Sequence, residues 1–70
     1  MNFAEHLTFL RENRAITQNQ MAKTLGISVH GYQRFEYGQQ EPRMSILVTL
    51  ADFFDISLDE LVCRDWPKER

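Results

Sequence analysis

The stretch TQNQMAKTLGISVHGYQRFEYG, residues 17–38, predicts two short helices separated by a tight turn. Thr17 and Gln20 have the spacing of a capping box, in which the threonine oxygen accepts a backbone N–H and the glutamine side chain reaches back. Apolar residues then recur at helical spacing and predict a helix that ends at Gly26; they are Met21, Ala22 and Leu25.

The second helix of this stretch begins after Ser28, a favourable N-cap residue. It is expected to span about residues 29–37 and to end at Gly38, with Tyr32 and Phe35 pointing inward. A turn of only about three residues separates the two helices, and such a glycine-containing turn makes them cross at a steep angle. The stretch therefore predicts a helix-turn-helix unit.

One further helix is predicted before this unit and two after it. Apolar residues at helical spacing predict one over Phe3–Asn13 and another over Met44–Phe54, after the break at Pro42. Ser57 and Glu60 form a second capping-box pattern, which starts a short fifth helix. Because no strand-like alternation is present, the chain is expected to be all-α, a compact five-helix bundle forming one domain over residues 1–70, with a short tail from about residue 64.

Composition agrees with a small folded domain. A chain of 70 residues has room for one core, and its 43% hydrophobic and 26% charged residues exclude an intrinsically disordered protein. The single cysteine, Cys63, cannot form an internal disulfide, so a cytoplasmic location is expected. No stretch approaches the roughly 20 apolar residues that cross a bilayer, so the chain is not expected to enter a membrane.

Charge is distributed unevenly along the chain. A net charge of −2 argues mildly against a nucleic-acid partner if the charge is spread evenly. Residues 17–43, however, carry three basic and two acidic side chains, whereas residues 44–70 carry three basic and six acidic ones. One face of the molecule is therefore expected to approach phosphate while the acidic end is held away.

The two segments TQNQMAKTLGISVHGYQRFEYGQQEP and ILVTLADFFDISLDELV carry a resemblance. They resemble the lambda-repressor-like helix-turn-helix family, the Cro and Xre type of bacterial and phage transcriptional regulator. The resemblance covers residue 7 to about residue 64. It implies a sequence-specific regulator of double-stranded DNA, most simply a repressor, that binds an operator as a two-fold dimer with its third helix in the major groove.

The resemblance also implies roles for individual residues. It places base contacts at Val29, His30, Gln33 and Arg34, and phosphate contacts at Thr17, Gln18 and Arg43. It further implies a structural ion pair between Arg11 and Glu36.

Helical geometry agrees with these base contacts, because the four residues lie on one side of the third helix, opposite the inward aromatic residues. Arg34 has the donors for guanine, Gln33 suits adenine, and Val29 suits a thymine methyl group. Gln18 lies in the first turn of its helix, where free N–H groups and the helix dipole favour phosphate.

Three features depart from the pattern of this family. Gly31 lies inside the recognition helix, where glycine costs about 1 kcal/mol relative to alanine, so either the backbone approaches DNA there or the helix is loose. Residues 39–41 lack lysine, so attraction to phosphate is expected to be modest. Arg43 stands where a serine cap is usual, so covering carbonyls or acids is an alternative to binding phosphate.

A dimer surface is expected on the fourth helix, the fifth helix and the tail. The apolar residues left over after the core is filled are Ile46, Val48, Phe53, Leu58, Val62 and Trp66. The alternative is a slightly larger core with Trp66 folded back over it.

Other functions find little support in the sequence. His6, His30 and Cys63 are too scattered for a metal site, and nothing provides a nucleophile with its base, so we expect no metal, no cofactor and no enzyme activity. The aromatic residues at helical spacing are expected in the core rather than as base-stacking platforms. The alternative function is a protein-interaction module or an antitoxin-like, partner-binding protein of the same fold.

Overall fold

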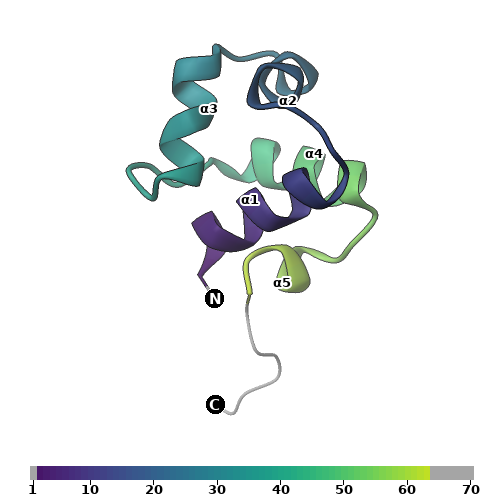
Figure 1. The fold of residues 1–70 in the computed structure, drawn as a ribbon. Helices are drawn as coiled ribbons and strands as arrows, with labels where there is room; N and C mark the ends of the chain where they lie inside the picture. Colours follow the sequence, from purple (N-terminus) through teal and green to yellow (C-terminus); the bar gives the residue numbers. More distant parts are fainter. Residues whose placement is uncertain (1, 64–70) are drawn as a thin grey trace.

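The computed structural model describes residues 2–63, and within that range all regular structure is helical. Five helices follow one another along the chain: α1 (Phe3–Asn13), α2 (Gln18–Leu25), α3 (Val29–Glu36), α4 (Met44–Phe54) and α5 (Leu58–Leu61). Figure 1 shows α2 and α3 at one end of the molecule and α5 at the other, with α1 and α4 between them. The predicted all-α architecture is confirmed, and α3 ends one residue earlier than expected, with Tyr37 as its C-cap.

Local capping explains where the helices begin and end. The Thr17 hydroxyl accepts the Gln20 N–H at 3.1 Å, and the Gln20 side chain accepts the Thr17 N–H at 2.8 Å, as the capping-box pattern predicts. Gly26 ends α2 at φ +72°, a left-handed conformation that glycine adopts without strain. The second capping box is only half formed, because Ser57 accepts the Glu60 N–H at 3.0 Å without a reciprocal bond.

The core lies where the five helices meet. Its buried side chains come from every helix: Leu7, Met21, Ala22, Tyr32, Phe35, Leu50, Ala51, Phe54 and Leu61. The prediction that the aromatic residues of α3 point inward is therefore confirmed. Met44, the first residue of α4, is 65% exposed, so the first turn of α4 extends beyond the packed region.

A buried ion pair joins α1 to α3. Arg11 on α1 donates from Nε to Oε2 of Glu36 on α3 at 2.5 Å and from Nη2 to Oε1 at 3.1 Å, while its Nη1 donates to the carbonyl of Ile16 at 2.7 Å. The side chains of Arg11 and Glu36 are 10% and 2% exposed. The ion pair implied by the family resemblance is therefore present, and it holds the α1–α2 connection as well as α3.

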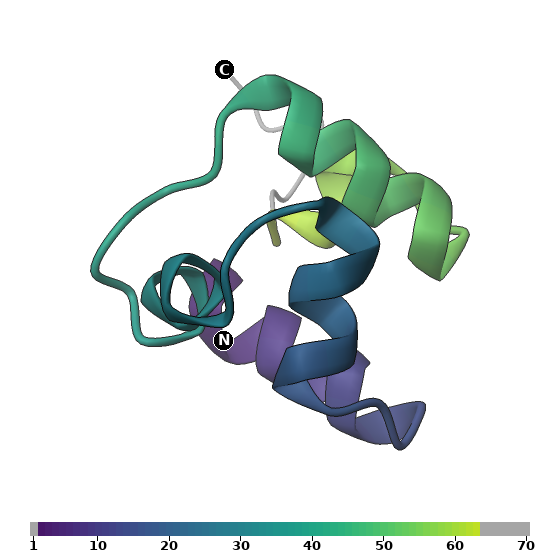
Figure 2. The same ribbon diagram turned by 90° about the horizontal axis from the view of Figure 1, so that it is seen from above.

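A second arginine fixes the far end of α4. The Arg14 guanidinium donates to the carbonyls of Phe53 and Phe54, at 3.4 and 3.0 Å, and lies over both aromatic rings. A cation at the C-terminus of a helix satisfies free carbonyls and is stabilised by the helix dipole. This contact attaches α4 to the end of α1. From above, the segment between α3 and α4 loops outward before α4 returns to pack beside α5 (Figure 2).

We expect Glu36→Ala to lower the free energy of unfolding by about 3 to 5 kcal/mol, because it leaves the buried Arg11 without its counter-ion. Glu41→Ala is the matched control, since Glu41 is an exposed acid near α3 and its loss is expected to change stability by less than about 1 kcal/mol. Urea denaturation of both variants measures the difference. Equal losses would show that the Arg11–Glu36 pair contributes nothing beyond a surface charge.

Candidate nucleic-acid interface

The outer face of α3 carries the four residues expected to contact bases. His30 and Arg34 are exposed, Gln33 is partly buried, and Val29 packs partly against the core. The opposite side of α3 is filled by the buried aromatic residues of the core. The helix therefore presents a continuous outward strip whose side chains include donors, acceptors and one methyl-bearing residue.

A hollow of about 480 Å³ runs along one flank of α3, against α2. Its lining includes the two α2-side residues expected to contact phosphate, and consists of Arg11, Thr17, Gln18, Asn19, Val29 and Gln33. Within the helix the N–H groups of Gln18 and Asn19 have no intrahelical acceptor, because they belong to the first turn. This end of α2 is thus suited to an anion.

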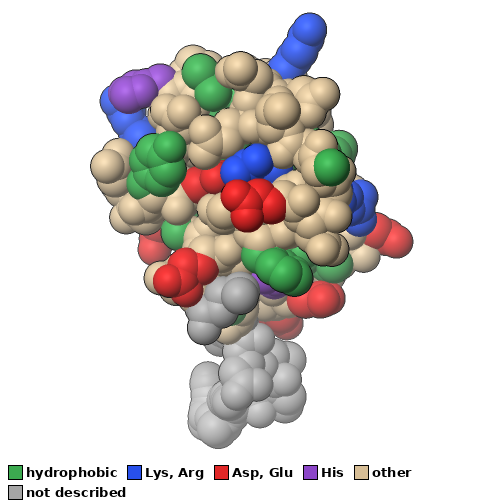
Figure 3. All heavy atoms as spheres, in the orientation of Figure 1, with side chains coloured by type: hydrophobic (Ala, Val, Ile, Leu, Met, Phe, Trp, Pro, Cys, Tyr) green, Lys and Arg blue, Asp and Glu red, His purple; other side chains and the backbone are tan. Residues whose placement is uncertain are grey.

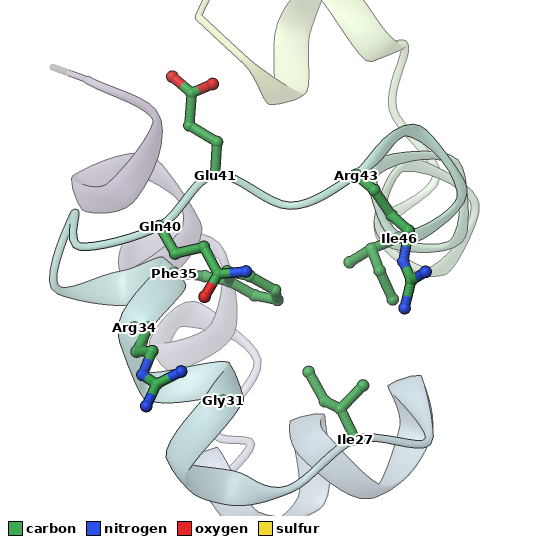
Figure 4. A pocket seen from close by; sticks show the side chains of 8 residues that line it. All are labelled: Ile27, Gly31, Arg34, Phe35, Gln40, Glu41, Arg43 and Ile46. Carbon is green, nitrogen blue, oxygen red and sulfur yellow. The ribbon is translucent and has the colours of Figure 1, made fainter.

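A second hollow of about 480 Å³ lies on the other flank of α3, towards the start of α4. Figure 4 shows Arg34 reaching into it from α3 and Arg43 from α4, while the Glu41 side chain points away. The apolar side chains of Ile27 and Ile46 line the space between the two arginines. Arg43 is the N-cap residue of α4, and its side chain makes no capping hydrogen bond.

Gly31 forms part of the α3 wall of this second hollow. Its N–H donates to the Ser28 hydroxyl at 3.0 Å, so the first turn of α3 is capped and regular around it. A Cβ atom added at Gly31 would meet only the Ser28 oxygen, at 3.2 Å, so packing against other elements does not require glycine here. The helix is therefore regular at Gly31, and its backbone there is not covered by another element.

Acidic side chains are distributed unevenly over the surface. Figure 3 shows no acidic side chain at the upper end of the molecule, where α2 meets α3, whereas acidic side chains lie over its middle and lower part. Histidine and basic side chains lie at the upper left, over α3. On this face, the end where α2 meets α3 therefore carries no acidic side chain that would repel phosphate.

A chain of hydrogen bonds leads from this face into the core. Gln33 Nε2 donates to Gln18 Oε1 at 3.0 Å, and Gln18 Nε2 donates to Glu36 Oε1 at 3.0 Å. Glu36 also accepts the Tyr32 hydroxyl. No local spacing pairs Gln18 with Gln33, so the amino-acid sequence alone does not indicate this connection.

The Glu36 carboxylate is held in its ionised form. Burial alone would raise its pKa, but the hydrogen bonds donated by Arg11, Tyr32 and Gln18 outweigh burial and hold the pKa below its ordinary value. The pKa of Tyr32 is raised, first by burial and then by its bond to the carboxylate. Glu36 is therefore an acceptor and Tyr32 a donor at neutral pH.

The residues expected at a dimer surface are only partly free. Val48 and Leu58 are 40% and 39% exposed, whereas Ile46, Phe53 and Val62 pack partly against the core of their own chain. Trp66 lies outside the described residues. Phe9, at 51% exposed, is a large apolar surface residue that the sequence analysis did not single out.

Among residues 2–63, no group of three or more His, Cys, Asp or Glu side chains is arranged to hold a metal ion. In the same range, no helix has both the length and the apolar character needed to cross a membrane.

Comparison with known proteins supports the sequence resemblance. The family model described as helix-turn-helix matches residues 8–61. The chain is 42% identical over 66 residues to the cryptic phage CTXphi transcriptional repressor RstR of Vibrio cholerae serotype O1, covering 94% of this chain and 58% of that protein. It is 37% identical over 60 residues to the uncharacterised HTH-type transcriptional regulator YqaE of Bacillus subtilis, covering 86% of this chain and 52% of that protein. The chain thus spans little more than half the length of these relatives.

Solved structures share the same arrangement of helices. A transcriptional regulator from Listeria innocua superposes with a TM-score of 0.88 at 29% identity, covering 97% of this chain and 62% of that one. The P22 c2 repressor, crystallised with a synthetic operator, superposes with a TM-score of 0.84 at 25% identity, covering 93% of this chain and 98% of that one. Because the family model matches most of the chain and the fold is shared with these structures, this protein belongs to the helix-turn-helix family.

Proposed function

We propose that this chain binds operator DNA as a sequence-specific transcriptional regulator, with α3 in the major groove. The observation that carries the proposal is the position of the outward strip of α3 between two hollows. One hollow is lined by Thr17 and Gln18, and the other by Arg43. A helix in the major groove has a phosphate backbone on either side, and this arrangement offers each backbone its own contacts.

The relatives support this function and its direction. The similarity to the CTXphi repressor and to the P22 c2 repressor, which was crystallised with an operator, favours repression. The proposed base contacts are Val29, His30, Gln33 and Arg34, and the proposed phosphate contacts are Thr17, Gln18 and Arg43. A DNA-reading role also agrees with the cytoplasmic location expected from the single cysteine.

We expect Arg34→Ala to weaken operator binding by about 1 to 3 kcal/mol and to remove the preference at one base pair, because arginine makes two hydrogen bonds to guanine. The operator is found first by selecting bound sequences from a pool of random duplexes, and the affinities are then measured at fixed salt. Lys23→Ala is the matched control, since it removes the same charge from an exposed position on α2.

Loss of affinity without loss of preference would make Arg34 a phosphate contact. If the wild-type protein selects no sequence and binds duplex DNA only weakly at low salt, the DNA-binding function is wrong and the alternative, a protein-interaction module of the same fold, is favoured.

We also propose that the chain acts as a homodimer that uses α4, α5 and the residues after them. One recognition helix reads only a few base pairs, and two copies about 34 Å apart meet successive major grooves on the same side of the duplex. The exposed Val48 and Leu58 lie on two helices that pack beside each other. The proposed surface also includes Ile46, Phe53 and Val62, which pack partly against the core, and Trp66, which lies outside the described residues.

We expect Leu58→Asp and Trp66→Ala to weaken self-association while helix content stays the same, because each removes an apolar contact from the proposed surface. Phe9→Ala is the control, since it removes an exposed apolar side chain from α1. Sedimentation equilibrium measures the dimer, and circular dichroism measures the helices. A wild-type protein that stays monomeric at high concentration and binds the operator without cooperativity would contradict the dimer.

A further inference from the structure

Gln18 connects the buried carboxylate of Glu36 to the outward face of α3. Its side chain is partly buried and makes two hydrogen bonds, one to Glu36 and one to Gln33, each of 3.0 Å. Gln33 in turn lines the hollow between α2 and α3. Within residues 2–63, the side-chain hydrogen bonds of Gln18 therefore link Gln33 to the ion pair in the core.

The carboxylate determines which way both amides point. An ionised carboxylate only accepts hydrogen bonds, so Gln18 must turn its Nε2 towards Glu36 and its Oε1 away from it. An amide oxygen also only accepts, so Gln33 must offer its Nε2 to Gln18. A reversed Gln18 amide would place its oxygen against the carboxylate oxygen, so the order does not reverse; Arg11 and Tyr32 fill the other acceptor positions of Glu36.

We propose that Gln18 is a positioning residue that fixes the amide of Gln33 for adenine and against guanine; this inference rests on the proposed function of reading DNA. Once one hydrogen of Gln33 Nε2 is bound to Gln18, the other hydrogen and Oε1 remain. Adenine offers the complementary pair in the major groove, an acceptor at N7 and a donor at N6. Guanine offers two acceptors, N7 and O6, one of which would face the fixed carbonyl oxygen.

This role differs from the phosphate contact expected of Gln18 from its place in the first turn of α2. A phosphate contact changes affinity about equally for all sequences, whereas a residue that orients a base-reading side chain changes the preference at one base pair. The two roles are compatible, because the backbone N–H of Gln18 stays available for phosphate while its side chain holds Gln33. Base preference is therefore the measurement that detects positioning.

The test compares base preferences of four proteins selected on random duplex pools: wild type, Gln18→Met, Gln33→Ala and the double variant. Methionine keeps the length of the Gln18 side chain and removes both hydrogen bonds. We expect wild type to prefer adenine at one position and Gln33→Ala to lose that preference. Gln18→Met is expected to lower the preference for adenine over guanine there by up to roughly 5- to 150-fold, the value of one two-bond base contact.

The double variant is expected to discriminate at that position no worse than Gln33→Ala, because both changes act on one contact. Asn19→Ala is the control: Asn19 lines the same hollow in the same turn of α2, and its loss is expected to leave the adenine preference unchanged. A Gln18→Met protein that loses affinity equally for all sequences, with its adenine preference intact, would overturn the proposal while leaving DNA binding in place.

A further variant changes Gln33 itself and removes its bond to Gln18, because a carboxylate and the Gln18 oxygen both only accept hydrogen bonds. Gln33→Glu has only acceptors, and we expect its preference to move from adenine to cytosine, which offers a donor at N4. A Gln33→Glu protein that keeps the adenine preference contradicts the proposed orientation of the side chain. If wild type selects no sequence at all, the proposed function itself fails, and the proposal about Gln18 fails with it.

Discussion

The structure depends above all on the buried carboxylate of Glu36. It accepts hydrogen bonds from Arg11 on α1, from Gln18 on α2 and from Tyr32 on its own helix, α3. Removing a charge from water is costly unless every lone pair finds a donor, and here the donors come from the three helices whose arrangement matters most. The helices are thus held together at the point where the recognition helix ends.

This constraint connects stability to the proposed reading face. The same carboxylate that anchors Arg11 also holds Gln18, which holds Gln33 on the outer side of α3. On the other flank the position of Arg43 depends on α4, which the Arg14 guanidinium attaches to α1 at its far end. Arg11 and Arg14, at the C-terminal end of α1, therefore connect α1 to the elements on both flanks of α3.

Sequence reasoning predicted the helices well because their ends are determined locally. Thr17, Ser28 and Gly26 cap or end helices through contacts within three or four residues, and spacing along the chain records such contacts directly. The inward side of α3 was equally accessible, since helical period alone separates Tyr32 and Phe35 from the outward residues.

Contacts between distant segments were not predictable in this way. The Gln18–Gln33 bond joins residues 15 positions apart, and the Arg14 bond to the end of α4 spans 40 positions. Met44 shares the apolar spacing that predicts α4 but is exposed, and only tertiary packing shows which apolar residues of α4 the core covers. The spacing also indicated that α4 and α5 carry more apolar residues than the core needs. How many of these residues the core covers depends on tertiary packing.

The central claim is that Glu36 is ionised and saturated by donors in the folded protein. The pKa of the Glu36 carboxyl is lower in the folded protein than in the unfolded chain. The stability that Glu36 supplies is therefore present above about pH 4.5 and is lost as the pH falls through the pKa of Glu36 in the folded protein. The most direct measurement is an NMR titration of the Glu36 side-chain carboxyl carbon. The account predicts a midpoint below the ordinary pKa of 4.5. A midpoint at or above that value would contradict it, because the donors from α1, α2 and α3 would then not outweigh the cost of burying the charge.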